Sequence, residues 1–361
     1  MKDLLAELAK VRKNDIPFQR ILGSMCTPPH EIAQKAYSLF IETNLGDYEL
    51  FKGTKKLESE AIRWVARLVH APPAVHGMMT SGGTEGNITS LWLYKTLSNK
   101  KEVLVPQQSH FSFLKAASLL SLNMKQIPCN YRMTVADVKK YVTKETMCIV
   151  GITGNTPYGY IDDIHELGEF CSDNHIYFHV DAAFGGFIAP FISDKKFDFR
   201  SKISSISLDS HKIGLSCIPS GFLFFHPSLD IQELIVQSHC THTAFQRGLL
   251  GTRPGASAAS AYAVFHYLDY EGYAKQAKAC MATTYFLTSQ LEENHIDFVP
   301  PELNIVAIKV DSPRDIARKL AELNWFVGID TMHNILRVVC MPHVSSDIIV
   351  KFIDDLQKVI L

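Results

Sequence analysis

The chain has 361 residues, with 36 Lys and Arg side chains against 37 Asp and Glu, so its formal net charge at pH 7 is −1. This length allows a sizeable core in two or three domains, and the balanced charge excludes a surface that would attract nucleic acid or an anionic membrane. Charges interrupt the first positions and no apolar run could cross a bilayer, so we expect a cytoplasmic protein without a signal peptide.

The cysteines and histidines show no pattern typical of a disulfide framework or a metal site. The 8 cysteines have no paired spacing and form no Cys-x-x-Cys motif, so we expect reduced thiols. Residues 239–242 read His-Cys-Thr-His, but no second pair of ligands lies at the spacing of a zinc finger. We therefore predict that the chain binds no metal.

Residues 1–55 are predicted to form an N-terminal segment of short helices and loops. Apolar residues at helical spacing predict an amphipathic helix over the first dozen positions. Glycine and proline make residues 21–29 irregular, and a second helix is expected over residues 30–42. Residues 43–54 are polar and marked by glycines. They form either an ordinary connector or a loop that lines a site, which makes Asn44 a candidate substrate-binding residue.

Residues 56–255 are predicted to form a large α/β domain. After an amphipathic helix, strand-like runs mostly alternate with helical stretches. These runs lie near residues 75–80, 103–105, 124–127, 147–152, 176–180, 203–208 and 220–225. Such alternation is typical of a mostly parallel sheet, here with seven strands and with helices on both faces.

Residues 256–361 are predicted to form a smaller C-terminal α+β domain. A long helix over about 255–270 leads into it, and residues 304–310 and 335–339 are expected to be strands flanked by helices. Because clefts between domains commonly hold ligands, we expect a ligand at this border.

Two charged residues follow predicted strands of the large domain, where ligands bind in open α/β sheets. Asp181 ends one strand and Lys212 lies in the loop after the next. Alone, Lys212 is equally a solvated loop lysine and Asp181 a turn or cap residue. Together, they offer an amine that can form an imine with pyridoxal phosphate and a carboxylate that can keep its ring nitrogen protonated. The pair therefore favours a pyridoxal phosphate site.

A glycine turn offers a place for the cofactor's phosphate. Residues 80–87 read Thr-Ser-Gly-Gly-Thr-Glu-Gly-Asn, directly after a predicted strand and at the start of a helix. Backbone N–H groups of this turn would face an anion there, with the positive end of the helix dipole behind them, and Thr84 could add a hydroxyl donor. The alternative is a tight turn that binds nothing.

Further candidates surround this pair in the sequence. His110 follows a predicted strand and is either a flat ring for stacking on the pyridine or a capping or surface histidine. Thr156 could donate to the cofactor's phenolic oxygen, although turn chemistry also accounts for its place. His211 could contact phosphate or a substrate carboxylate. Ala183 and Asp209 belong to the same motifs and are further cofactor-binding candidates.

Arg253 lies in the stretch Gly-Thr-Arg-Pro-Gly and is the best candidate for a fixed cation that binds a substrate carboxylate. A guanidinium group binds such an anion through two parallel hydrogen bonds. The alternative is a surface ion pair. Arg337 is a weaker candidate of the same kind.

The order of these motifs resembles that of the pyridoxal-phosphate-dependent group II amino-acid decarboxylases, most closely the archaeal L-tyrosine/L-aspartate decarboxylases. The motifs that carry the resemblance are residues 23–26, 42–46, 50–55, 81–85, 110–113, 179–186, 211–212, 218–221, 251–253 and 341–343. Those around Asp181 and Lys212 are specific for the cofactor class, and the N-terminal ones indicate the archaeal subgroup.

The resemblance implies a fold-type I homodimer with active sites at the subunit interface and pyridoxal 5′-phosphate as cofactor. It implies that Lys212 forms the imine, that Asp181 contacts the ring nitrogen and that His110 lies on the ring face. Gly83 and Thr84 would bind the phosphate. The implied reaction is decarboxylation, of L-aspartate to β-alanine for coenzyme A synthesis or of L-tyrosine to tyramine.

Two departures from the family pattern stand out. Asn155 occupies a position where the family usually has a second threonine, which affects a cofactor contact. Residues 237–243 lack the aromatic loop that in relatives is thought to protonate the carbanion, so the proton donor and the substrate stay open.

Two other functions remain open at this point. Sphingosine-phosphate lyases share the Asp-Ala and His-Lys signatures, which keeps carbon–carbon cleavage as an alternative; the absence of an expected membrane anchor favours a decarboxylase. A catalytically inactive binding protein on the same fold is the third hypothesis, and the presence of both Asp181 and Lys212 disfavours it.

Overall fold

A computed structural model describes residues 1–360 and divides the chain into two compact units. The large unit is Pro29–Lys278, and the small unit combines Met1–Pro28 with Ala279–Leu361. Each unit has its own sheet and core. The domain borders predicted from the sequence, at residues 55/56 and 255/256, remain a prediction.

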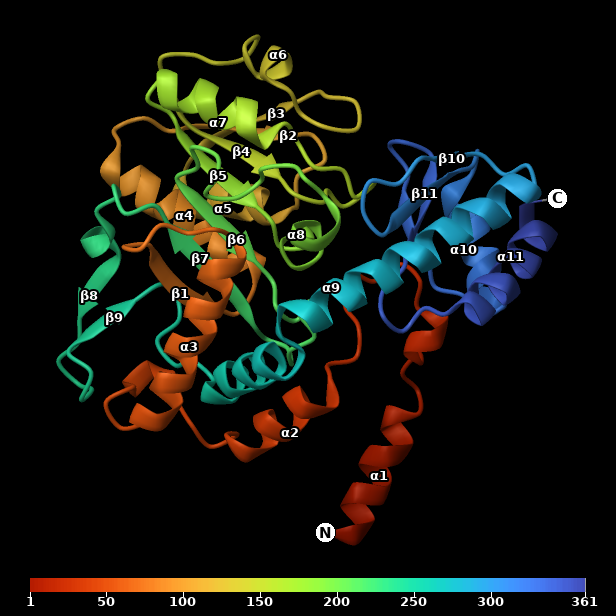
Figure 1. The fold of residues 1–361 in the computed structure, drawn as a ribbon, viewed down its shortest axis with the longest axis horizontal. Helices are drawn as coiled ribbons and strands as arrows, with labels where there is room; N and C mark the ends of the chain where they lie inside the picture. Colours follow the sequence, from red (N-terminus) through yellow and green to blue (C-terminus); the bar gives the residue numbers. More distant parts are fainter. Residues whose placement is uncertain (361) are drawn as a thin grey trace. The chain divides into compact units, whose positions relative to one another are not determined.

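The large unit is built on a seven-stranded sheet with the strand order β1-β7-β6-β5-β4-β2-β3 (Figure 1). The strands are β1 (His76–Thr80), β2 (Glu102–Pro106), β3 (Asn123–Ile127), β4 (Thr146–Ile152), β5 (Tyr177–Asp181), β6 (Ser205–Leu208) and β7 (Gly221–Phe225). All seven predicted runs are confirmed. The pairs from β3 through β6 are parallel, whereas β7 runs antiparallel to both β6 and β1.

Helices cover both faces of this sheet. Helices of the large unit include α3 (Lys52–Leu68), α4 (Gly83–Leu97), α5 (Ser112–Leu120), α6 (Val135–Val138), α7 (Ile164–Asp173) and α8 (Ala189–Ile192). Successive side chains of a strand point to opposite faces: Leu223 lies against Gly86 of α4, whereas Phe224 lies against Gly77 on the side of α3. Every residue of β4 is buried, as expected for a central parallel strand covered on both faces.

The small unit contains a four-stranded antiparallel sheet with the order β10-β11-β13-β12. Its elements are α1 (Lys2–Arg12), β10 (Phe298–Val299), β11 (Ile305–Lys309), α10 (Pro313–Glu322), β12 (Gly328–Asp330), β13 (Ile335–Val339) and α11 (Ser346–Ile360). Buried Trp325, Leu336 and Phe352 belong to its core. The two predicted strands and the α+β class of this part are confirmed.

Two details differ from the sequence-based expectation. Helix α9 (Gly255–Glu293) continues well past residue 270, with a kink at Asp269 (φ +51°) where a single helix end was expected. The loop region around 237–243 is the turn of a hairpin, β8 (Ile235–Gln237) and β9 (Phe245–Arg247), whose three-residue strands are too short to show alternation.

The predicted helix near 30–42 is α2 (Glu31–Leu39). Within residues 1–360, no helix combines the length and apolarity needed to span a membrane.

Candidate active site

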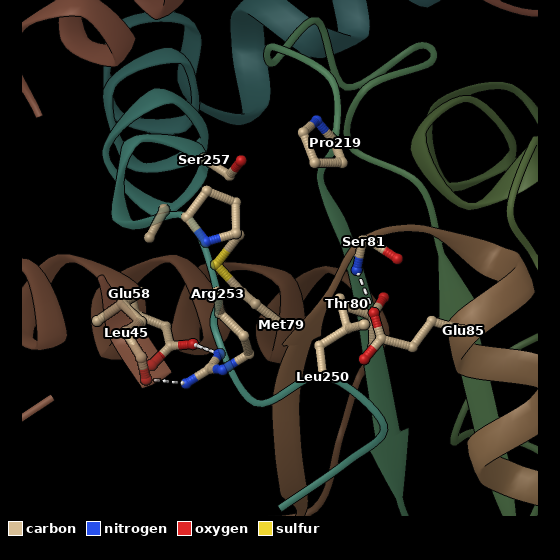
Figure 2. A pocket seen from close by; sticks show the side chains of 12 residues that line it. Leu45, Glu58, Met79, Thr80, Ser81, Glu85, Pro219, Leu250, Arg253 and Ser257 are labelled. Atoms are coloured by element: carbon tan, nitrogen blue, oxygen red, sulfur yellow. Dashed lines mark hydrogen bonds and ion pairs between the residues drawn. The ribbon is translucent and has the colours of Figure 1, made fainter. Parts of the chain in front are cut away.

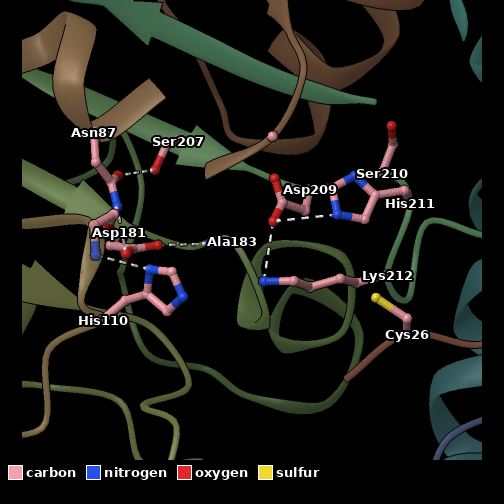
Figure 3. A network of polar contacts seen from close by, with 12 residues as sticks. Cys26, Asn87, His110, Asp181, Ala183, Ser207, Asp209, Ser210, His211 and Lys212 are labelled. Carbon is pink, nitrogen blue, oxygen red and sulfur yellow. Dashed lines mark hydrogen bonds and ion pairs between the residues drawn. The ribbon is translucent and has the colours of Figure 1, made fainter. Parts of the chain in front are cut away.

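The ends of β5 and β6 bring the two central sequence candidates into one site (Figure 3). Asp181 is the last residue of β5 and pairs in register with Ser207 of β6. Asp209 and Lys212 are the first and fourth residues after β6 and lie in the same region. The Lys212 Nζ atom lies 3.0 Å from Asp209 Oδ2, and only 17% of the lysine side chain is exposed.

His110 lies close enough to Asp181 and Lys212 for both charges to affect its pKa. Burial lowers the pKa of its imidazole; the negative charge of Asp181 opposes this effect, and the positive charge of Lys212 adds to it. The Ser112 N–H donates to His110 Nδ1 over 3.2 Å, so in the neutral ring Nε2 carries the hydrogen. The site therefore holds a neutral, flat ring with one donor, which suits the predicted position on a pyridine face.

Asp181 is 6% exposed and accepts hydrogen bonds on both carboxylate oxygens. The Ala183 N–H donates to Oδ1 over 3.0 Å, and the Asn87 amide donates Nδ2–H to Oδ2 over 2.8 Å. Because both oxygens accept, the orientation of the Asp181 carboxylate is fixed. Asn87 was not among the sequence candidates. The sequence feature that could have indicated it is a polar residue on the buried face of a helix. An amide buried there without hydrogen-bond partners would cost free energy.

Glycines at the start of α4 leave a cradle between this helix and the ends of β5 and β6. A Cβ on Gly82 would come within 2.9 Å of His211 Cε1, and one on Gly83 within 2.9 Å of Ala183 Cβ. Gly82 also has a φ of +152°, which favours glycine. The first N–H groups of a helix have no intrahelical acceptor, so those of Gly83 and the half-buried Thr84 suit an anion.

Asp209 and His211 close the other side of this cradle. The His211 Nδ1 atom lies 2.6 Å from the Ser220 carbonyl oxygen. Asp209 Oδ2 contacts Lys212, while its buried Oδ1 has no hydrogen-bond partner among the described residues. The site thus has four features that fit pyridoxal phosphate. They are a cradle at glycines that a Cβ would fill, a buried oxygen without a hydrogen-bond partner among the described residues, an amine and a fixed carboxylate.

The loop after β4 accounts for one departure from the family pattern. Asn155 accepts from the Tyr158 N–H on Oδ1 over 3.0 Å and donates Nδ2–H to the Tyr131 carbonyl over 2.7 Å. Its side chain thus joins two loops, a task that a threonine is too short to perform. Thr156 follows it in the turn closed by the bridge between Thr153 and Ile161, and its predicted cofactor contact stays a prediction.

The two predicted substrate-binding residues lie side by side. Asn44 Oδ1 accepts from the Arg253 N–H over 3.2 Å. The Arg253 guanidinium pairs with Glu58 and donates to the Leu45 carbonyl over 3.0 Å (Figure 2). The side chain of Glu58 is only 1% exposed, so this ion pair is buried rather than superficial. A substrate carboxylate would have to compete with Glu58 for Arg253.

The charge on Glu58 depends on its cations. Burial raises the pKa of Glu58, but Arg253 and Lys55 lower it more, and the net pKa lies below the usual value. Arg253 and Glu58 also line a small cavity of about 50 Å³ that extends to Ser81, directly before the glycine turn. Arg253 therefore shares a cavity wall with Ser81, the residue before the glycine turn.

Buried His179 on β5 predicts a pH dependence of stability. Burial lowers its pKa from 6.5 to about 3. As pH falls below 6.5, the unfolded chain binds a proton that the native ring excludes, so the free energy of unfolding should decrease, by about 2 kcal/mol between pH 7 and pH 5. Urea unfolding of the parent and of His179→Phe at both pH values measures this contribution. An equal pH dependence in the two proteins would contradict it.

The chain is similar to known proteins over nearly its whole length. Residues 30–310 match the family model described as the pyridoxal-dependent decarboxylase conserved domain. A probable L-tyrosine/L-aspartate decarboxylase of Methanocella arvoryzae is 40% identical over 368 residues, which cover 99% of this chain and 98% of the relative. A probable L-aspartate decarboxylase of Archaeoglobus fulgidus is 36% identical, with 99% of each chain covered.

The fold is also found in a solved sphingosine-1-phosphate lyase of Burkholderia pseudomallei. Its structure matches with a TM-score of 0.90 at 23% identity and covers 99% of this chain and 90% of that one. Such a likeness shows a common fold and leaves the reaction to be decided by the site and by the sequence relatives.

Proposed function

The chain belongs to the pyridoxal-dependent decarboxylase family, and on this basis we propose that it removes the α-carboxyl group of L-aspartate, with L-tyrosine as the second candidate substrate. It is an amino-acid decarboxylase of fold-type I with pyridoxal phosphate as cofactor, as the sequence predicted. The lyase alternative is supported by a common fold alone. The family likewise disfavours an inactive binding protein.

The convergence of Lys212, His110 and Asp181 at the ends of β2, β5 and β6 is the observation that carries the proposed site. Pyridoxal phosphate, when bound, supplies a protonated ring that takes up the electron pair left as carbon dioxide departs. Lys212 provides the amine that holds the cofactor's aldehyde carbon. Asp181 holds the proton on the ring nitrogen, and the N-terminus of α4 binds the phosphate.

Neutral His110 has a separate role in this proposal. With Nδ1 occupied by the Ser112 N–H, its ring is oriented and its Nε2–H can be offered to the substrate carboxylate. Because His110 is neutral, it stabilises the substrate carboxylate in the ground state less than a protonated imidazole would. The ring therefore does not oppose the loss of this negative charge when the carboxylate leaves as carbon dioxide.

The choice of aspartate is supported by the relatives. One is named for both substrates and another for L-aspartate alone. The product would then be β-alanine, and we propose that the enzyme supplies it for coenzyme A synthesis. The predicted cytoplasmic location stays a prediction.

A panel of amino acids tests this function. The purified protein, loaded with pyridoxal phosphate, is incubated separately with L-aspartate, L-tyrosine, L-glutamate and sphingosine phosphate, and carbon dioxide, amine and aldehyde products are quantified. We expect β-alanine and carbon dioxide in equal amounts from L-aspartate. Tyramine as the only product would overturn aspartate as the substrate and keep decarboxylation. Turnover of sphingosine phosphate to an aldehyde without carbon dioxide would overturn the decarboxylase itself.

We further infer that the enzyme is a homodimer with its active sites at the subunit interface. Large apolar side chains beside the site support this, since Phe111 and Leu114 on the α5 side of His110 are 55% and 54% exposed. Sedimentation equilibrium should give twice the chain mass of 40.5 kDa. A monomer at micromolar concentration that retains full activity would contradict the interface.

A further inference from the structure

We propose that Asn87 is a positioning residue that fixes the orientation of the Asp181 carboxylate as the acceptor for the cofactor's ring nitrogen, an inference that rests on the proposed role of Asp181. Asn87 lies in the first turns of α4, 1% exposed, between the phosphate cradle and the sheet. It reaches Asp181 through one direct hydrogen bond (Figure 3).

All hydrogen-bonding positions of the Asn87 amide are occupied. Its Nδ2 donates to Asp181 Oδ2 over 2.8 Å and to Ser112 Oγ over 3.0 Å. Its Oδ1 accepts from Ser207 Oγ over 2.8 Å and from His179 Nε2 over 2.9 Å. Two donors and two lone pairs are the full capacity of this side chain. The amide is therefore fixed in position.

The orientation of the amide follows from its partners. If the oxygen and nitrogen were exchanged, Oδ1 would face the Asp181 carboxylate, and two acceptors would meet in a buried place. The observed orientation turns a donor toward the carboxylate and an acceptor toward the donors on β5 and β6.

The network continues away from Asp181 and fixes the state of His179. His179 Nδ1 lies 2.7 Å from Ser205 Oγ, and the Tyr94 hydroxyl lies 2.5 Å from the same oxygen. Burial lowers the pKa of His179 to about 3, so the ring is neutral, and because Nε2 donates to Asn87, Nδ1 is the acceptor. Tyr94, Ser205 and His179 are all fully buried. Ser205 Oγ also lies 3.3 Å from Ser90 Oγ, so the network branches at this serine, and its arm through His179 and Asn87 ends at Asp181.

This arrangement places an amide between the Asp181 carboxylate and the imidazole of His179. A histidine in direct contact with Asp181 could exchange a proton with it, whereas an amide donates without losing its hydrogen at any pH of interest. Asn87 therefore holds the Asp181 carboxylate in one orientation, while His179 stays neutral behind it. In this orientation Asp181 can accept from the cofactor's ring nitrogen.

Two substitutions test this role in different ways. Asn87→Asp retains an oxygen for His179 and Ser207 but replaces the donor to Asp181 with a second carboxyl group. Asn87→Leu removes both halves of the amide and retains the number of side-chain heavy atoms. Asn304→Leu is the matched control, because Asn304 is also fully buried but donates to Cys340 in the small unit.

The readout is the dissociation constant of pyridoxal phosphate for the cofactor-free protein, together with the absorption spectrum of the bound cofactor. We expect both Asn87 variants to bind about 10- to 100-fold more weakly, as is typical when a supporting side chain is lost, and Asn304→Leu to bind like the parent. The Asn87→Asp variant keeps the comparison valid if Asn87→Leu does not fold.

The same substitutions in an Asp181→Asn background distinguish positioning from general support. If Asn87 acts through Asp181, its replacement should change affinity no more than about twofold once Asp181 is gone, because coupled residues are not additive. An equal loss in both backgrounds would overturn the inference and leave the proposed function intact. Unchanged affinity and spectrum in Asp181→Asn itself would overturn both the inference and the proposed site.

Discussion

Replacing Lys212 with alanine should abolish amine formation and remove the visible absorption band of the bound cofactor. The lysine provides the only amine of the site in contact with Asp209, and no other described side chain of the site can take its place as a covalent anchor. We expect kcat to fall by about four to six orders of magnitude, the range measured when a covalent catalytic residue is removed. The measurement is carbon dioxide release with saturating pyridoxal phosphate.

Lys202→Ala is the control for this substitution. Lys202 is exposed, lies just before β6 and pairs with Glu169, so its loss should leave both the spectrum and turnover unchanged. A Lys212→Ala protein that retained the visible band and normal turnover would show that another amine binds the cofactor.

Replacing Asp181 with asparagine should lower kcat/KM for decarboxylation by about 10²- to 10³-fold, the usual effect of removing one fixed electrostatic group from an active site. The neutral amide is nearly the same size but cannot hold a proton on the ring nitrogen. The ring would then take up electrons less readily. Steady-state assays over a range of pyridoxal phosphate concentrations separate this effect from weaker cofactor binding.

Asp198→Asn is a suitable control, because Asp198 is another fully buried carboxylate of the large unit but pairs with Arg200 and His70. It should lower stability with little effect on kcat/KM. If Asp181→Asn were as active as the parent, the carboxylate would not be the partner of the ring nitrogen.

The parts of the site that come directly after strands of the sheet could be predicted from the sequence. Asp181 and Lys212 each come directly after a β-rich run, and the carboxyl ends of parallel strands meet at one edge of a sheet. Gly83 and Thr84 were recognisable because a glycine turn between a strand and a helix leaves backbone N–H groups open to an anion. These are local signals that sequence patterns contain.

Contacts between distant residues were beyond the sequence. The buried partner of Arg253 is Glu58, 195 positions away, and spacing gave no reason to choose this acid over the others. Asn87 reads as an ordinary helix residue until β5 and β6 are placed beside α4. The short strands β8 and β9 and the kink at Asp269 depend on tertiary packing in the same way.

The most direct test of the proposed chemistry is to find where the cofactor is attached. The purified enzyme, loaded with pyridoxal phosphate, is reduced with borohydride and digested, and the peptides are identified by mass spectrometry. We predict one pyridoxyl group, on the peptide that contains Lys212. Attachment to a different lysine, or no attachment in a protein that still decarboxylates amino acids, would contradict the central claim.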